Sequence, residues 1–166
     1  MHLIIDGYNL IQQTPELSLA QDLGQGRKTL LRALRLYRKN KSHRLTVVFD
    51  GGEEFKLRQA SLQGVPVIFS GSRLSADQVI VELAQSQGEG ATIITDDREM
   101  ASLCRARGAE VIEARVFAAR LMEAAQGSGL VVEDDEVGWN FSTKKKGPSH
   151  REPKAKRRRN SRLDKL

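Results

Sequence analysis

The sequence predicts an α/β fold with a doubly wound, mostly parallel sheet of about five strands and flanking helices. Short aliphatic runs alternate with helical stretches along residues 3–125, the order expected of repeated strand–helix units. The first run, residues 3–5, is aliphatic at every position, which is typical of a strand buried on both faces. Right-handed crossovers would bring the carboxyl ends of the parallel strands to one edge, where open α/β sheets bind ligands.

This first strand ends at Asp6, and the following Gly7 permits a sharp turn of the backbone. No helix is expected to begin directly after Asp6. Residues 12–25 mix polar residues with proline and glycine, and they predict a loop with room for one short helix. A helix is predicted over residues 27–40 from an apolar stripe at helical spacing. The stripe consists of Leu30, Leu31, Leu34 and Tyr37.

The alternation continues through the rest of the body. Ser75 opens a helix, Gln78 completes a capping-box pattern three residues later, and Gly88 and Gly90 end it. The remaining strands are expected at residues 45–49, 65–69, 91–95 and 110–113. The remaining helices are expected at residues 53–63, where the pattern is weaker, and at 98–107 and 116–125.

Charge divides the chain into a mildly acidic body and a basic end. Residues 142–166 hold eleven lysines and arginines against two acids, a net +9, which leaves −3 of the total +6 for residues 1–141. We therefore predict a folded domain at 1–126, an acidic linker at 127–141 and a disordered, polyanion-binding tail at 142–166. The tail cations predicted to contact RNA are Lys144, Lys145, Lys146, Arg157, Arg158 and Arg159.

Several classes of protein are disfavoured. The single cysteine, Cys104, excludes an internal disulfide and a cysteine-rich zinc site, and the three histidines lack the spacing of metal ligands. Neither of the glycine-rich nucleotide-binding motifs GxGxxG and GxxxxGK[ST] occurs. No apolar run approaches bilayer length and no basic-then-apolar signal region precedes the first strand, so a cytoplasmic protein without membrane contact is expected.

Acidic residues recur where predicted strands end or helices begin. Asp6, Asp50, Asp77, Asp96 and Asp97 are placed to face one cleft at the carboxyl edge of the sheet. Carboxylates a few ångströms apart repel each other, by roughly 4 kcal/mol at an effective dielectric of 20, and tend to shift their protonation or recruit a cation. Oxygen ligands without cysteine or histidine suit Mg²⁺ or Mn²⁺, which can activate a water and stabilise charge on a phosphodiester.

Each of these residues also has a structural interpretation. Asp77 and Asp96 can be acids that complement a helix N-terminus, and Asp50 precedes two glycines in a natural turn. Asp6 is the hardest to explain as a capping residue, since no helix is expected after it. Asn9 fits a turn but could also orient a water or a phosphate. Four cations on the first long helix form either a solvated face or a contact to the nucleic-acid backbone. They are Lys28, Arg32, Arg35 and Lys39.

Four motifs stand at the expected ends of elements: DGYNLI after the first strand, VVFDG after the basic helix, SADQVI opening a helix and TDD closing a later strand. Together they resemble the NYN-domain ribonucleases, in particular the bacterial YacP-like family, whose fold is a variant of the PIN nuclease fold. The similarity extends from Leu3 to about Leu121. The resemblance implies a metal-dependent endoribonuclease with a PIN-like fold. The residues that it implies for the site are Asp6, Asn9, Asp77 and Asp96, with Asp97 beside the last and Asp50 as an additional acid.

The leading hypothesis is an endonuclease acting on RNA, with mRNA in a translation-related setting as substrate and one or two Mg²⁺ or Mn²⁺ ions among Asp6, Asp77, Asp96 and Asp97. The alternative is a non-catalytic RNA- or ribosome-binding module in which the acids are structural. A phosphotransfer receiver is disfavoured, because nothing resembles a phosphoacceptor site with its lysine partner. The expected partners are RNA and, as a further candidate, the ribosome.

Overall fold

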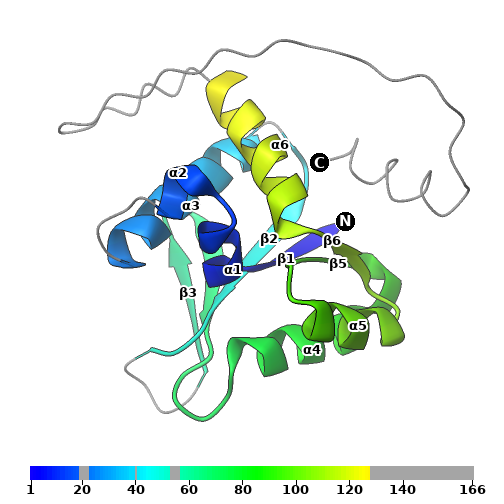
Figure 1. The fold of residues 1–166 in the computed structure, drawn as a ribbon. Coiled ribbons are helices and arrows are strands. Elements are labelled where there is room, and N and C mark those ends of the chain that lie inside the picture. The colour runs from blue at the N-terminus through cyan, green and yellow to red at the C-terminus, as the bar shows by residue number, and fades with distance from the viewer. Residues whose placement is uncertain (19–22, 40, 53–56, 128–166) are drawn as a thin grey trace, which may run out of the picture.

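The computed structural model describes residues 1–18, 23–39, 41–52 and 57–127 of the protein. These residues form a six-stranded sheet in the order β3-β4-β2-β1-β5-β6, parallel except for β3 (Figure 1). The strands are β1 (His2–Asp6), β2 (Arg44–Phe49), β3 (Arg58–Leu62), β4 (Val65–Phe69), β5 (Ala91–Ile94) and β6 (Glu110–Ile112). The helices are α1 (Gly7–Gln12), α2 (Pro15–Ser18), α3 (Leu23–Lys39), α4 (Ala76–Gln87), α5 (Arg98–Ala106) and α6 (Ala114–Gly127), with a short 3-10 turn at Gly88–Gly90. The predicted α/β fold class is confirmed.

The first strand of the chain lies in the middle of the sheet. β1 pairs in parallel with β2 on one side and with β5 on the other, so Ile5 stands between Val47 and Ile94. Neighbours on both edges and helices on both faces explain why its aliphatic residues are completely buried. Consequently Asp6, the last residue of β1, is held at the centre of the carboxyl edge.

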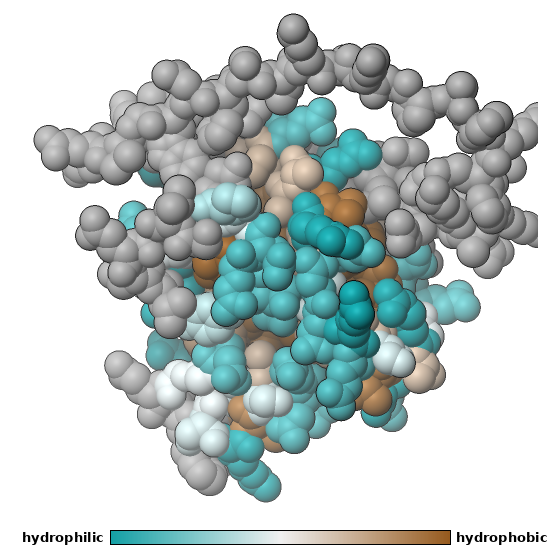
Figure 2. Space-filling view, in the orientation of Figure 1, coloured by the Kyte–Doolittle hydropathy of each residue, from teal (hydrophilic) through white to brown (hydrophobic). Residues whose placement is uncertain are grey.

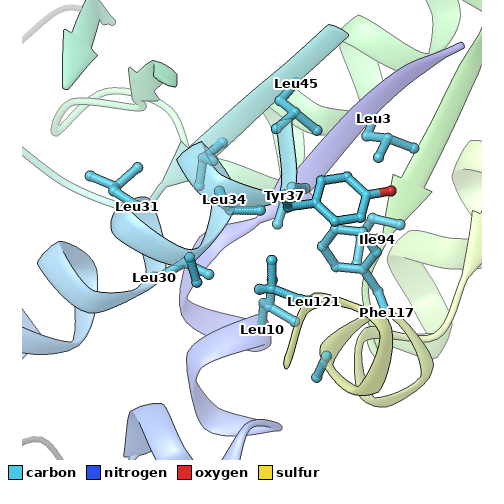
Figure 3. Packing of buried hydrophobic residues seen from close by; sticks show 14 of the residues in the cluster. Leu3, Leu10, Leu30, Leu31, Leu34, Tyr37, Leu45, Ile94, Phe117 and Leu121 are labelled. Atoms are coloured by element: carbon cyan, nitrogen blue, oxygen red, sulfur yellow. The ribbon is translucent and has the colours of Figure 1, made fainter. Parts of the chain in front are cut away.

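Helices cover both faces of the sheet (Figure 1). α1, α3 and α6 pack on one face, and their core includes Leu10, Leu34 and Phe117, all fully buried. In Figure 3 the ring of Tyr37 meets that of Phe117 edge to face, at a centroid distance of 5.4 Å. α4 and α5 pack on the other face around Ile80 and the buried Cys104. Burying each large apolar side chain stabilises the fold by roughly 1.5–3 kcal/mol, so both helix layers are firmly held.

The amphipathic patterns of α3 and α4 produce the helices that they predict. In α3 the apolar stripe is buried, and Lys28, Arg32, Arg35 and Lys39 are exposed. The helix begins at Leu23, four residues earlier than expected. In α4 both hydrogen bonds of the predicted capping box are present between Ser75 and Gln78. No helix in the described part of the chain is long and apolar enough to span a bilayer.

The helix predicted over residues 53–63 is wrong. Residues 58–62 form β3, which pairs antiparallel with β4 through a two-residue turn. Gln63 and Gly64 in that turn have φ of 53° and 78°. Positive φ at both central positions gives the twist that joins adjacent antiparallel strands. β3 is an edge strand with a largely exposed surface, so its sequence carries no buried alternation. Residues 53–56 lie outside the described ranges.

The expectation that no helix follows Asp6 is also wrong, because α1 begins at Gly7. The Asp6 side chain caps this helix by accepting a hydrogen bond from the backbone N–H of Asn9 at 3.1 Å. Gly7 is required here because an added Cβ would lie 2.6 Å from Cδ1 of Phe49 and closer still to Cε1. The short helix allowed for in residues 12–25 is α2.

Candidate functional site at the carboxyl edge of the sheet

The strand order reverses between β1 and β5. From β1 the chain proceeds through α3 to β2 and then outward to β4, whereas α4 carries it back across the other face to β5. Ligands of open α/β sheets bind outside the carboxyl ends of the strands at such a reversal. Asp6 leaves β1 and Asp96 and Asp97 follow β5, so the predicted site residues stand at this position.

Asp6 has the most perturbed acid group at this edge. Its pKa is raised from the usual 3.8 to about 6, mainly because burial removes water from the carboxylate. The hydrogen bond from the Asn9 N–H opposes this rise, and the charges of Asp77, Asp97 and Asp50 add to it. Asp77, Asp97 and Asp50 are therefore the carboxylates whose charges raise the pKa of Asp6. We call these four residues the acid cluster.

Two members of the acid cluster are placed by helix starts. Asp77 lies in the first turn of α4, and its pKa is raised by burial and by the charges of Asp97, Asp50 and Glu99. Asp97 caps α5 by accepting a hydrogen bond from the N–H of Met100 at 2.8 Å. Both helices pack on the same face of the sheet. Their N-terminal ends bring the two carboxylates towards Asp6 from that face.

Asp50, the residue after β2, connects the end of that strand to the segment after β4 and to the start of α4. One carboxylate oxygen accepts hydrogen bonds from the Ser70 hydroxyl at 3.1 Å and from the N–H of Ala76 at 3.0 Å. Ser70 follows β4 and is fully buried, and Ala76 is the first residue of α4. Asp50 therefore fixes the start of the helix that carries Asp77, in addition to contributing charge to the acid cluster.

Asn9 and Asp96 connect the two sides of the strand reversal. The side-chain oxygen of Asn9 accepts a hydrogen bond from the N–H of Asp96 at 2.9 Å, joining α1 to the chain after β5. The Asp96 carboxylate in turn accepts from the N–H of Ala114, the first residue of α6, at 3.0 Å. Its charge acts on Arg115, which also pairs with Glu113 at 3.0 Å. Asp96 thus faces α6, while Asp97 belongs to the acid cluster.

The acid cluster offers carboxylate oxygen ligands alone, the chemistry that Mg²⁺ and Mn²⁺ prefer. A cation would relieve the repulsion and desolvation that raise the pKa values of Asp6 and Asp77. The donor chemistry and electrostatics therefore fit a divalent ion. Among the described residues, however, no three His, Cys, Asp or Glu side chains are grouped closely enough to hold one ion together.

The predicted RNA-contacting cations lie at different distances from this edge. The Arg27 side chain reaches Phe69 at the end of β4, whereas the carbonyl oxygen of Lys28 accepts a hydrogen bond at 3.5 Å from the Gln63 side chain, in the turn before β4. α3 runs back toward the amino edge, and its rise of 1.5 Å per residue places Lys39 about 16 Å further along. The helix cations therefore form a row leading away from the acid cluster. The predicted tail contacts at 144–146 and 157–159 lie outside the described residues.

Comparison with known proteins identifies the family. The sequence model of the YacP-like NYN domain matches residues 3–164. The chain belongs to the YacP-like NYN domain family. The match extends well past Leu121, where the similarity was expected to end, and includes most of the basic segment. A NYN domain of this family has a nuclease-like fold, which is the fold found here.

Two solved structures support this assignment of the NYN fold. One is Rae1 (YacP) from Bacillus subtilis, 26% identical with a TM-score of 0.64, covering 80% of this chain and 79% of that one. The other is a mutant of the same protein, 24% identical with a TM-score of 0.63, covering 76% and 77%. No curated protein matches the sequence significantly.

The sequence indicated Asp50 only as an additional acid and did not reveal that its carboxylate connects the end of β2 to Ser70 and to the start of α4. The signal was available only in part, since DGG predicts a turn but not a hydrogen bond to a helix start 26 residues later. The adjacent pair Asp96 and Asp97 likewise gave no indication of which carboxylate would face Asp6.

Figure 2 shows that the visible face is mostly hydrophilic, with apolar colour in small separate patches.

Proposed function

We propose that this NYN-domain protein is a metal-dependent endoribonuclease that cleaves RNA at the carboxyl edge of its sheet. The observation that carries the proposal is the raised pKa of Asp6 beside Asp77, Asp97 and Asp50, at the strand reversal where α/β folds bind ligands. Strongly perturbed acids at such a position indicate a functional site more than a capping role. The nuclease-like fold of the family supports the same reading.

In this proposal the acid cluster would hold Mg²⁺ or Mn²⁺, and a bound ion would supply an activated water and a positive charge for the scissile phosphate. Asp6, Asp77 and Asp97 provide the oxygen ligands, while Asp50 positions Asp77 through the start of α4. Asn9 keeps α1 and the segment after β5 at a fixed separation. Asp96, implied as a ligand by the family resemblance, remains proposed and is tested separately below.

The substrate that we propose is RNA, with mRNA in a translation-related setting as the natural form and the ribosome as a candidate partner. The family supports an RNA-related role. The net +9 of residues 142–166 supports binding to a polyanion, because cations that neutralise phosphates release counterions and gain affinity from it. The exposed cations of α3 would extend this contact along the surface of the domain.

One observation favours the alternative, a non-catalytic RNA- or ribosome-binding module. Asp6 and Asp97 cap helices, Asp50 holds the start of α4 and Asp96 holds the start of α6, so four of the five acids have structural partners. In this alternative the acids would serve to hold the fold together and would take no part in a reaction. Such a protein would not cleave RNA, and removal of a single acid would change only its stability.

Cleavage of a long RNA in Mn²⁺, with and without chelator, distinguishes the two candidates. We expect cleavage that the chelator abolishes, and losses of at least about a hundredfold in Asp6→Asn and Asp77→Asn, the scale of a positioned catalytic group. Glu89→Gln removes an exposed acid from the opposite edge and serves as the control. Asp96→Asn shows whether the carboxylate facing α6 is also needed. Wild-type cleavage by Asp6→Asn and Asp77→Asn would rule out the proposed site.

A further inference from the structure

Three aromatic rings and one guanidinium form a continuous row at the carboxyl edge. The centroid of the Tyr8 ring lies 5.1 Å from that of Phe49 in an edge-to-face arrangement. Phe49 stacks on Phe69 with centroids 5.9 Å apart and an interplanar angle of 25°. The guanidinium carbon of Arg27 lies 5.9 Å from the centre of the Phe69 ring. We call these four residues the aromatic row.

The aromatic row lies beside the acid cluster but on the other face of the sheet. Phe49 and Phe69 belong to the core beneath α1 and α3. The next residues along their strands, Asp50 and Ser70, are bonded to each other, and Asp50 accepts from the start of α4 on the opposite face. Successive residues of a strand point to opposite faces. The sheet edge therefore carries carboxylates on one side and rings on the other.

Burial differs along the aromatic row. Phe49 is completely buried beneath Gly7 and Tyr8, whereas Tyr8, Phe69 and Arg27 are only half-buried. Tyr8 at one end of the row and Phe69 with Arg27 at the other therefore keep part of their surface exposed. Aromatic rings and guanidinium planes of this kind are the groups on which unpaired nucleic-acid bases stack. Arg27 and the adjacent exposed Lys28 also provide positive charge for the connecting phosphates.

We propose that the aromatic row is a base-stacking subsite that selects unpaired RNA nucleotides beside the scissile phosphate. This inference rests on the proposed function, since it assigns the substrate class to the same edge. Tyr8 receives one base and the Phe69–Arg27 pair receives another, while buried Phe49 fixes the spacing between them. A base inside a duplex is covered on both faces by its neighbours, so only a single-stranded segment can use this subsite.

The test measures binding without cleavage. A fluorescently labelled uridine 12-mer and a 12-mer of the same charge that lacks every base are titrated with the full-length protein in chelator, and anisotropy reports the Kd. Tyr8→Leu removes the ring but keeps an apolar side chain against Phe49. Arg27→Lys keeps the charge but removes the planar guanidinium. Tyr8→Phe keeps the ring and is the matched control.

We expect Tyr8→Leu and Arg27→Lys to weaken uridine binding at least about fivefold, which corresponds to about 1 kcal/mol for one stacked base. Binding of the base-free oligomer should not change, and Tyr8→Phe should behave as the wild type. Equal losses on both oligomers, or no loss on either, would overturn the subsite. If Tyr8→Leu does not fold, Arg27→Lys decides alone. A protein that shows the expected base dependence but does not cleave RNA in Mn²⁺ contradicts the nuclease proposal and leaves the stacking subsite standing.

Discussion

At the scale of single residues, Asp6 combines two roles that usually have opposite effects on a carboxylate. Capping α1 favours the ionised form, since the N–H of Asn9 donates to it. Burial and three neighbouring acids favour the protonated form, and they prevail, so the pKa is raised to about 6. An ionised Asp6 therefore destabilises the folded protein at neutral pH. Functional groups commonly retain such a destabilising charge in the unliganded protein, because a bound cation or substrate relieves it.

We predict that Asp6→Asn increases the free energy of unfolding at pH 8 by as much as about 3 kcal/mol in chelator, at about 1.4 kcal/mol per pKa unit. Folded Asp6 holds a proton between pH 4 and about 6 that the unfolded chain has released. Its contribution to stability is therefore lost as the pH rises through that window. The difference in unfolding free energy between Asp6→Asn and the wild type should vanish near pH 4, apart from a pH-independent contribution from the changed cap of α1. Urea unfolding of both proteins from pH 4 to 8 measures this.

Taking the difference between the two proteins removes the titrations of groups that do not interact with Asp6. Burial lowers the pKa of His2, so its contribution has the opposite sign and is lost as the pH falls below about 6.5. Since His2 is unchanged in Asp6→Asn, its effect cancels. A difference in unfolding free energy that stays constant from pH 4 to pH 8 would show that Asp6 has an ordinary pKa.

Gly7 is a second residue at which small changes have large expected effects. In Gly7→Ala the new Cβ would overlap the Phe49 ring, which must move within a closely packed core. We expect destabilisation by about 1–3 kcal/mol, the usual result of overpacking. Thermal or urea unfolding measures it.

Two further variants test the cause of the Gly7→Ala effect. Gly90→Ala is the control, because nothing lies within 4 Å of its added Cβ. Phe49→Leu should recover part of the loss when it is combined with Gly7→Ala, since the two side chains are in contact. Additive effects of the two substitutions would contradict the overlap.

At the scale of elements, sequence patterns predicted the buried strands and long helices and missed the pieces held by tertiary contacts. β1 and α3 follow from aliphatic runs and helical spacing. β3 does not, because its largely exposed residues are ordered by hydrogen bonds to β4 and by the turn at Gln63 and Gly64. α1 is only six residues long, too short to form alone, and depends on the Asp6 cap and on packing against Phe49.

The candidate site was likewise predictable from the sequence only in part. The positions of Asp6, Asp77 and Asp97 at one edge followed from the expected topology and from the family motifs. The direction of each carboxylate did not, because it depends on backbone N–H groups that only the folded chain brings near. Ala76 N–H holds Asp50 and Ala114 N–H holds Asp96, and neither contact is local in sequence.

The hydrogen bond between Asn9 and the Asp96 N–H is the connection at which this long-range assembly can be tested. Asn9→Ala leaves that part-buried N–H without its acceptor, so we expect a loss of about 1–3 kcal/mol in unfolding free energy. Gln12→Ala, an exposed substitution in the same helix, should stay within about 0.5 kcal/mol of wild type. Equal stability of the two variants, measured by urea unfolding, would show that the bond contributes nothing.

At the scale of the whole molecule, we predict that RNA cleavage and much of the RNA binding reside in different parts of the chain. The acid cluster belongs to the domain, whereas the excess positive charge belongs to residues 142–166. If the tail makes about five phosphate contacts, its removal should reduce the log–log salt slope of single-stranded RNA binding by about 3–4, from about 0.7 per contact. Kd measured against salt concentration for the full chain and for a chain ending at Phe141 tests this.

Cleavage provides the second readout for the truncated chain. Because the acid cluster is retained, the turnover rate at saturating RNA should be that of the full chain. An unchanged salt slope would show that the basic segment has another role. A truncated protein that binds RNA but has lost its turnover would show that the tail takes part in the chemistry as well.

The central place of β1 also determines when the protein becomes competent during its synthesis. Because synthesis proceeds from the amino end, Asp6 is made well before its neighbours Asp77 and Asp97 and the flanking strand β5, which follow only after most of the domain has been translated. Such long-range pairing is formed late, after loop closure over many residues. A growing chain that ends before residue 91 lacks β5, the partner of its first strand on one side, and it also lacks Asp97 of the acid cluster. If the chain has the nuclease activity proposed above, it would be unable to cleave the message that encodes it until nearly the whole domain has emerged.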